Sequence, residues 1–405
     1  MAEFRRHVFC GAATAFLALA AGSAFAADAD DRTAYIRTDL VSNLLTLAQP
    51  PDSNLQNPWG VANIPGGPLW VSDNNSGVST LYDGNGVKQG LTVTIPLPPG
   101  RAAPPPAAPT GMVWNPTADF TITSGMVPRA APLAGHGGGG HGGGGGGRAQ
   151  APAIFIFDTE DGTISAWNPA VDLIVSGHST ATLVIDNSGA GAVYKGLAFG
   201  TNKHGNFLFA TNFAAGTVEA YDSNFELTSL DGKFSDPDIP TGFAPFGIHN
   251  IDNNLYVTYA KQNAQKNDVV AGAGLGFVDV FTTDGVLIKR FASRGRLNAP
   301  WGVARATQNF GQFSGSILVG NFGEQGDFAG WINVFSGADD NHFLGSLRDA
   351  RRKPIAIDGL WSIVFGTFLN SDGDTLYFTA GPNQQTNGLF GRIVAQPRPD
   401  VDAMK

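Results

Sequence analysis

A short glycine-led motif recurs six times along this chain, and this repetition constrains the fold more than any other feature. The six copies are GVSTLY, GTISAW, GTVEAY, GFVDVF, GWINVF and GLFGRI, which begin at Gly77, Gly162, Gly216, Gly276, Gly330 and Gly388. In five of the six, an aromatic residue follows the glycine five positions later. Self-similarity at a period of ~20–50 residues or a little more indicates a repeat architecture.

A second repeated element precedes each copy of the first. It reads NPWGVAN, PTGMVW, YKGLAF, APFGIHN, APWGVAR and DGLWSIV, aligned on Gly60, Gly111, Gly196, Gly247, Gly302 and Ser362. The spacings between these positions are 51, 85, 51, 55 and 60 residues. The long spacing contains the Pro/Ala/Gly-rich segment 117–152, which includes GHGGGGHGGGGGG. We expect this segment to be a disordered insert, because it has almost no apolar side chains to bury.

Each repeat unit contains four strand-like runs, in the first unit residues 59–64, 69–73, 77–83 and 87–95, with a tight DGNG turn at 83–86. We therefore predict an all-β fold, a six-bladed β-propeller of four-stranded antiparallel blades. The predicted blades cover about 57–95, 110–186, 194–230, 244–291, 299–347 and 358–395. The last blade lacks a fourth strand. We predict that an N-terminal strand, 34–42, pairs with 388–395 and closes the ring, which removes exposed sheet edges.

The N-terminal segment is typical of an exported protein. Arg5, Arg6 and His7 precede an apolar run at 8–21, and Ala24-Phe25-Ala26 provides small residues at a cleavage site. We predict that 1–26 is a signal peptide and that the protein is secreted or periplasmic, the alternative being a retained anchor. The only cysteine, Cys10, lies in this segment, so we expect no disulfide or thiol chemistry in the mature chain. Residues 396–405 form a predicted C-terminal tail.

Charge and composition limit the classes of partner that we expect the protein to bind. The net charge is −9, and 15% of residues are charged. This acidic balance disfavours nucleic acid and anionic membranes as partners. We expect a monomer with no transmembrane segment in the mature chain.

The repeated glycines and aromatic residues are expected to be structural. We predict that Gly60, Gly247 and Gly302 allow close backbone approach around the central channel. We predict that the adjoining Trp59, Phe246 and Trp301 pack between neighbouring blades.

Polar loops between the second and third strands of the blades are the candidate binding face. The residues that we expect at the mouth of the channel are Asp73, Asn74, Asp158, Asn212, Asn321, Glu324, Asp327 and Asn383. Asp73, Asn212 and Asn321 are weak candidates for holding a divalent cation such as calcium, which prefers oxygen ligands. The alternative is that these side chains make turn hydrogen bonds. Blades 4–6 have the longer and more polar loops, so we expect a ligand on that side.

Catalytic signatures are absent from the sequence, which contains neither GxSxG nor HExxH. GAGLGF, from Gly272, lies between two predicted strands and not before a helix, so it does not indicate a phosphate-binding loop. His136 and His141 lie in the insert and are a poor metal site. Glu324 and Asp327 are the best local carboxylate pair.

At NPWGVAN…LWVSDNNSGVSTLYDGNG and NAPWGVAR…ILVGNF…GWINVFSG the chain resembles a family of uncharacterised secreted bacterial proteins, some of which end in a PEP-CTERM sorting tail. More distantly, its strands are similar to NHL-type and gluconolactonase-type propellers. The lactonase resemblance implies a divalent ion held by Glu, Asp and Asn side chains in the channel.

These observations support two main hypotheses of function. The first is a binding or interaction module that uses the loop face of blades 4–6, with an envelope protein, a glycan or a small molecule as its partner. The alternative is a metal-dependent hydrolase or lactonase with its ion in the channel mouth. A third hypothesis is an envelope or matrix structural protein tethered by its insert.

Overall fold

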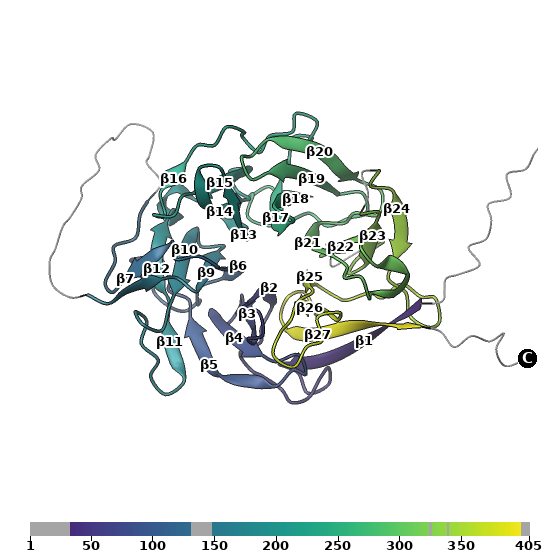
Figure 1. Ribbon diagram of the computed structural model, residues 1–405, viewed down its shortest axis with the longest axis horizontal. Coiled ribbons are helices and arrows are strands. Elements are labelled where there is room, and N and C mark those ends of the chain that lie inside the picture. The colour runs from purple at the N-terminus through teal and green to yellow at the C-terminus, as the bar shows by residue number, and fades with distance from the viewer. Residues whose placement is uncertain (1–32, 131–147, 324–325, 338–339, 398–405) are drawn as a thin grey trace, which may run out of the picture.

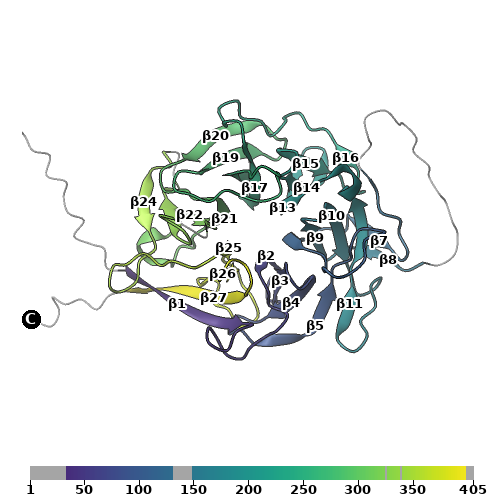
Figure 2. The ribbon, with the colours of Figure 1, turned by 180° about the vertical axis from the view of Figure 1, so that it is seen from behind.

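The computed structural model describes residues 33–130, 148–323, 326–337 and 340–397. The predicted signal peptide, the central part of the glycine-rich insert and Glu324 lie outside these residues. Within the described part, six small antiparallel sheets stand around one axis (Figures 1 and 2), so the predicted six-bladed propeller is confirmed. The described residues contain no helix that is both long and apolar enough to cross a membrane.

The first three blades follow the chain in order. Blade 1 contains β2 (Pro58–Asn63), β3 (Leu69–Asp73), β4 (Val78–Tyr82) and β5 (Lys88–Thr94). Blade 2 contains β6 (Pro109–Trp114), β9 (Phe155–Thr159), β10 (Thr163–Trp167) and β12 (Thr182–Asp186), and the short helix η1 (Ser188–Ala190) follows it. Blade 3 contains β13 (Tyr194–Asn202), β14 (Gly205–Asn212), β15 (Thr217–Tyr221) and β16 (Leu227–Thr228).

The other three blades complete the circle. Blade 4 contains β17 (Phe243–Ile251), β18 (Asn254–Lys261), β19 (Gly276–Thr282) and β20 (Leu287–Ser293). Blade 5 contains β21 (Pro300–Arg305), β22 (Ile317–Asn321), β23 (Ile332–Phe335) and β24 (Phe343–Ser346), with the short helix η2 (Gly311–Phe313) between its first two strands. Blade 6 contains β25 (Leu360–Val364), β26 (Leu376–Ala380), β27 (Leu389–Pro397) and β1 (Thr33–Ser42).

The pairing of β1 with β27 closes the ring, as the sequence predicts. The two strands are antiparallel, with Tyr35 opposite Ala395 and Ser42 opposite Leu389. Figure 1 shows the purple β1 beside the yellow β27. β27 extends to Pro397, two residues into the predicted C-terminal tail. Because one blade is built from both ends of the chain, neither end of the ring is left as an open sheet edge.

The prediction that 117–152 is disordered is wrong at the flanks of this segment. β7 (Thr121–Thr123) and β8 (Gln150–Pro152) form an antiparallel two-stranded ribbon. Phe120 and Ile122 are fully buried, and the Phe120 ring packs on Phe225 at 5.5 Å. Burial of these apolar side chains offsets the entropy cost of ordering the flanks. The Pro/Ala/Gly-rich composition of the segment as a whole obscures these few apolar residues.

Blade 1 gains a fifth strand that the repeat pattern does not predict. β11 (His178–Thr180), from the connection between β10 and β12 of blade 2, pairs in parallel with β5. The Trp167 indole donates a hydrogen bond to Ser179 Oγ at 2.8 Å and fixes this connection. The extra strand ties two neighbouring blades together.

Apolar cores lie between neighbouring blades, so no blade has a core of its own. Six buried clusters each combine side chains from two adjacent blades. The innermost strands approach each other closely: a Cβ at Gly60 would lie 2.5 Å from Thr110 O, and one at Gly247 would lie 2.4 Å from Trp301 O. A larger residue at these positions would push the blades apart.

Candidate functional site

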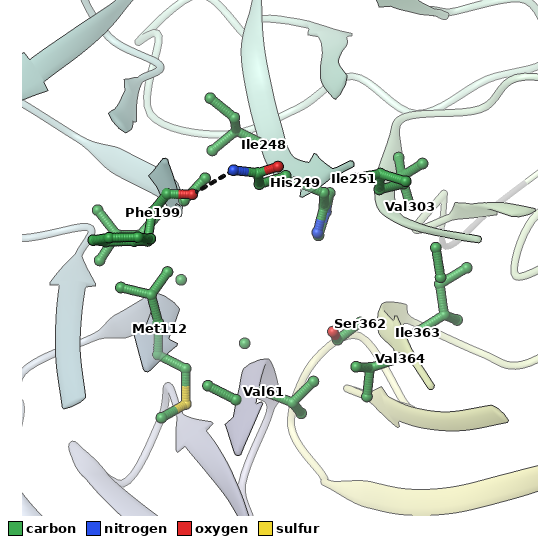
Figure 3. Close-up of a pocket in the computed structure, with 18 of the residues that line it drawn as sticks. Val61, Met112, Phe199, Ile248, His249, Ile251, Val303, Ser362, Ile363 and Val364 are labelled. Carbon is green, nitrogen blue, oxygen red and sulfur yellow. Dashed lines mark hydrogen bonds between the residues drawn. The ribbon is translucent and has the colours of Figure 1, made fainter. Parts of the chain in front are cut away.

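The innermost strands of all six blades line a cavity on the axis of the ring. Its volume is about 370 Å³, and it lies at the C-terminal halves of these strands. Val61, Met112, Ile248, Val303 and Ile363 are among the apolar lining residues, and Figure 3 shows them arranged around the open centre. A concave and mostly apolar pocket with a few polar groups is the usual form of a small-molecule site.

The polar side chain of His249 points toward the open centre of this cavity (Figure 3). Its Nε2 lies 2.9 Å from Trp301 O, and its ring packs edge-on against the Trp301 ring at 5.4 Å. A carbonyl oxygen only accepts, so Nε2 carries the proton and Nδ1 is an acceptor. Burial lowers the pKa of His249 to about 4. The ring is therefore neutral at pH 7, and Nδ1 has no hydrogen-bond partner among the described residues.

The repeat contains a signal for His249 that the motifs alone do not reveal. Two positions after the aligned glycine or serine, the other five blades have small apolar residues: Ala62, Val113, Ala198, Ala304 and Val364. Only blade 4 has a polar residue at this position. Comparing the six units position by position would have identified His249.

Other polar side chains also line the cavity, and Ser362 is drawn with its oxygen at the open centre in Figure 3. Asn250 Nδ2 donates to Phe199 O at 2.8 Å, the dashed bond in Figure 3. Arg305 forms an ion pair with Asp252 at 2.9 Å. Asn250 and Arg305 thus have protein partners, whereas His249 Nδ1 has none among the described residues.

Six aromatic residues close the axis next to this cavity, and we call them the axial aromatic cluster: Trp59, Phe213, Phe246, Trp301, Phe322 and Trp361. Trp59 stacks on Trp361 with their centroids 3.5 Å apart, and Phe322 stacks on Trp361 at 3.9 Å. Trp59 also lies 6.4 Å from Phe246, which belongs to the opposite blade. The expectation of packing between neighbouring blades is thus too narrow, because these side chains converge on the axis.

Lys195 occupies the position at which four other blades have an aromatic residue of this cluster. Its side chain is 1% exposed and forms an ion pair with Glu160, which is 29% exposed. Its Nζ lies 5.0 Å from the Trp59 ring centroid and 5.8 Å from that of Phe213. Burying an ammonium requires both the paired charge and the aromatic faces.

A chain of amide side chains borders the cluster. Trp361 Nε1 donates to Asn57 Oδ1 at 2.8 Å, and Asn57 Nδ2 lies 3.2 Å from Asn74 Oδ1. Asn74 Nδ2 in turn donates to Glu160 Oε2 at 3.1 Å. The predicted residue Asn74 therefore lies near the axis, but its hydrogen bonds hold the cluster in place.

Asp73 and Asp158 are fully buried. Thr80 Oγ1 donates to Asp73 Oδ2 at 2.7 Å, and Thr110 Oγ1 donates to Asp158 Oδ1 at 2.8 Å. Burial raises the pKa of Asp158 to about 7 and that of Asp73 well above its usual value. Burial thus shifts both carboxyl groups toward the protonated form, which is the weaker ligand for a cation.

The remaining predicted residues also have separate roles. Asn212 Nδ2 donates to Glu219 Oε1 at 2.7 Å, whereas Asn321 Nδ2 donates to Arg296 O at 2.8 Å and Phe328 O at 2.9 Å. Asp327 and Asn383 are exposed. The hydrogen-bond partners of Asp73, Asn212 and Asn321 are all different, so no shared ligand set links these three residues.

One cluster of potential metal ligands occurs among the described residues, away from the predicted loops. His204, Asp231 and Asp284 place one ligand atom each within 4.8 Å of one another. Lys203 Nζ already pairs with Asp231 at 2.8 Å, and two of the three residues are exposed. This geometry is common on protein surfaces without a metal.

Comparison with known proteins identifies relatives along most of the chain. Two uncharacterized proteins of Acanthamoeba polyphaga mimivirus are similar to it. One is 31% identical over 363 residues, which are 87% of this chain and 78% of the viral protein. The other is 32% identical over 360 residues, 88% of this chain and 84% of the viral protein. No protein-family model matches the chain.

Solved structures similar to this one include a protein of unknown function from Bacteroides thetaiotaomicron, with a TM-score of 0.49, 12% identity and coverage of 90% of this chain and 76% of that one. Another is virginiamycin B lyase from Staphylococcus aureus, with a TM-score of 0.46, 12% identity and coverage of 89% and 99%. At these TM-scores the likeness says nothing of the chemistry of this chain. The bacterial origin implied by the sequence resemblance stays a prediction.

Proposed function

Since this chain belongs to the same family as the two uncharacterized mimivirus proteins, whose names assign no activity, we propose a function from its own geometry: a binding module whose principal ligand occupies the axial cavity. The observation that carries this proposal is the Nδ1 acceptor of His249, which has no partner among the described residues and lies in a pocket of about 370 Å³ with both apolar and polar lining residues. An uncharged small molecule with an apolar body and one hydrogen-bond donor fits this chemistry.

The apolar part of the wall and the His249 acceptor make separate contributions to ligand binding. Burial of the apolar body supplies affinity at about 25 cal/mol per Å². The donor pairs with His249 Nδ1, which a bound ligand without a donor would cover and leave unpaired, and such a pairing contributes about 1–1.5 kcal/mol. A ligand without a donor loses that contribution and leaves the acceptor buried.

Titration calorimetry with 2-naphthol and 2-methoxynaphthalene tests the proposal, because only the first compound donates a hydrogen bond. We expect the wild-type protein to bind 2-naphthol about tenfold more tightly, which corresponds to ~1.4 kcal/mol. The His249→Leu variant should bind both compounds alike. The preference should persist from pH 8 to pH 6 and disappear as the pH falls through about 4, where His249 becomes protonated.

His178→Leu, which replaces an exposed histidine outside the cavity, is the matched control and should keep the preference. Equal affinity of the wild-type protein for both compounds, or no binding of either, would overturn the assignment of the cavity.

We also propose that the protein acts outside the cytoplasm, on the strength of the signal-like segment 1–26. Cell fractionation and N-terminal sequencing of the mature chain test this proposal. A cytoplasmic protein that retains Met1 would contradict it.

The alternative, a metal-dependent hydrolase or lactonase, gains no support at the residues predicted to bind its ion. The side chains of these residues form hydrogen bonds with different partners, as seen for Asp73, Asn212 and Asn321. Metal analysis of the purified protein, with melting curves in EDTA and in calcium, tests this alternative directly. A stoichiometric ion whose removal lowers the melting temperature would favour it over a binding module.

A further inference from the structure

A second pocket lies between blades 4 and 5, beside the turn that links β20 to β21. Its volume is about 420 Å³. We call it the Arg294–Arg296 groove, and its lining residues include Phe291, Arg294, Arg296, Phe335 and Phe343. None of these residues lines the axial cavity. The groove therefore combines aromatic walls with two cationic side chains from a single turn.

Backbone and amide hydrogen bonds hold this turn in place. Arg294 N donates to Gly276 O at 2.8 Å, and Leu297 N donates to Arg294 O at 2.9 Å. Arg296 O accepts hydrogen bonds from Asn321 Nδ2 at 2.8 Å and Asn333 Nδ2 at 3.1 Å. Asn321 thus positions the turn. A ligand would meet a preorganised backbone, which lowers the entropy cost of binding.

Aromatic faces position both guanidinium groups. Arg296 lies 5.1 Å from the Phe328 centroid and 5.0 Å from that of Phe343, and Arg294 lies 5.3 Å from the Phe277 centroid. Such cation–π contacts use the face of a guanidinium group and leave its in-plane N–H donors available.

The two arginines have no carboxylate partner among the described residues. Arg290, which also packs on Phe277, differs in this respect because it forms ion pairs with Asp236 and Asp279. In a chain with a net charge of −9, two neighbouring arginines without a carboxylate partner in the described part of the chain are a local excess of positive charge. A planar carboxylate is the natural partner of a guanidinium fork.

The wall of the groove indicates what the rest of the ligand would contact. Phe343 is 40% exposed and lies edge-on to Phe335 at 5.6 Å, and Phe335 lies edge-on to Phe291 at 5.5 Å. This row of rings offers a partly exposed surface for an aromatic body next to the two cations.

We propose that the Arg294–Arg296 groove is a binding site for a small aromatic carboxylate, with the carboxylate on the guanidinium groups and the aromatic ring against Phe343. This site lies between blades 4 and 5 and shares no lining residue with the axial cavity, so either assignment can fail without the other.

Titration calorimetry with 2-naphthoate tests the groove, with 2-methoxynaphthalene as the uncharged comparison. We expect the wild-type protein to bind 2-naphthoate and Arg294→Gln/Arg296→Gln to bind it at least tenfold more weakly. Raising the salt concentration should weaken the wild-type binding, because the contact is electrostatic. Arg296→Lys, which keeps the charge but loses the planar fork, should fall between the two.

Two control variants distinguish binding in the groove from binding in the axial cavity and from nonspecific attraction to surface arginines. His249→Leu changes the axial cavity and should leave 2-naphthoate binding unchanged. Arg351→Gln removes an exposed arginine elsewhere and should also have no effect. No binding by the wild-type protein, or equal binding by the double variant with an unchanged melting temperature, would overturn the proposal. A tenfold loss in His249→Leu would place the naphthoate in the axial cavity and would overturn it too.

Discussion

His249 and Lys195 are residues at which the repeat departs from its own pattern, and each departure puts a polar group on the axis. In both places the backbone follows the same innermost strand as in the other blades, so only the side chain differs. His249 puts an acceptor among apolar neighbours, and Lys195 puts a cation among aromatic rings. The chemistry of the ring therefore comes from exceptions to the repeat.

Asp158 is the residue whose titration should be visible in stability. Its raised pKa of about 7 means that the folded state favours the protonated carboxyl. The stabilisation of the folded state by this protonated carboxyl is complete below about pH 3.8, the pKa of an Asp in the unfolded chain. It is lost as the pH rises through about 7, the pKa in the folded protein. Asp158→Asn cannot ionise and keeps an acceptor for Thr110. The free energy of unfolding of the variant, measured relative to wild type, should therefore increase by roughly 2–3 kcal/mol between pH 5 and pH 8.

Urea unfolding of both proteins at the two pH values measures this difference, in which the titration of other groups cancels. A difference that does not change with pH would show that Asp158 is ionised in the folded protein.

At the scale of elements, β1 decides whether the ring is closed. Tyr35 on this strand is 1% exposed, stacks with Phe313 at 5.8 Å and donates from its hydroxyl to Phe310 O at 3.0 Å. Phe310 and Phe313 belong to blade 5, so the N-terminal strand joins blade 6 to its neighbour as well as completing it.

Truncation of this side chain should therefore destabilise the whole propeller. We expect Tyr35→Ala to cost about 3–5 kcal/mol, because it leaves a cavity in the core between blades 5 and 6. Tyr35→Phe should cost only about 1 kcal/mol, since it removes the hydroxyl that bonds to Phe310 O and keeps the ring. Denaturant unfolding measures both values. Similar costs for the two variants would mean that packing of β1 contributes little.

At the scale of the whole molecule, the axis joins side chains that are distant in sequence. Glu160 comes from blade 2, Lys195 from blade 3 and Trp59 from blade 1, yet they form one buried contact. Removing one partner of a buried ion pair leaves an uncompensated charge, whereas replacing the buried cation with an apolar residue avoids that penalty.

This asymmetry is testable in a double-mutant cycle. Glu160→Gln should destabilise the protein by about 1–3 kcal/mol, since Glu160 is partly exposed and water can compensate some of the loss. Lys195→Met should be close to neutral, and Glu160→Gln in the Lys195→Met background should cost little. The free energy of unfolding of all four proteins gives the coupling. An equal cost of Glu160→Gln in both backgrounds would contradict the pairing.

Much of the architecture follows from the sequence because each repeat unit carries its own local signals. Glycines with positive φ at the turns, such as Gly86 and Gly285, and alternating apolar residues define the strands. The missing last strand and the extra N-terminal one predict the closure. The ordered flanks of the insert and β11 were missed, because their stability comes from contacts with other blades: Phe120 with Phe225, and β11 with β5.

By itself the sequence determined the number of blades, their strands and the closure of the ring. These features depend on local periodicity and on the number of strand-like runs in each repeat unit. Only the tertiary structure decided where a site could form. Whether Asp158 is buried, whether Asn321 holds a turn and whether His249 faces a cavity all depend on how six separate blades pack around one axis. The same polar residue types occur in turns and in binding sites, so the sequence does not separate the two. Burial and hydrogen-bond partners separate them, because desolvation determines the chemistry of each polar group.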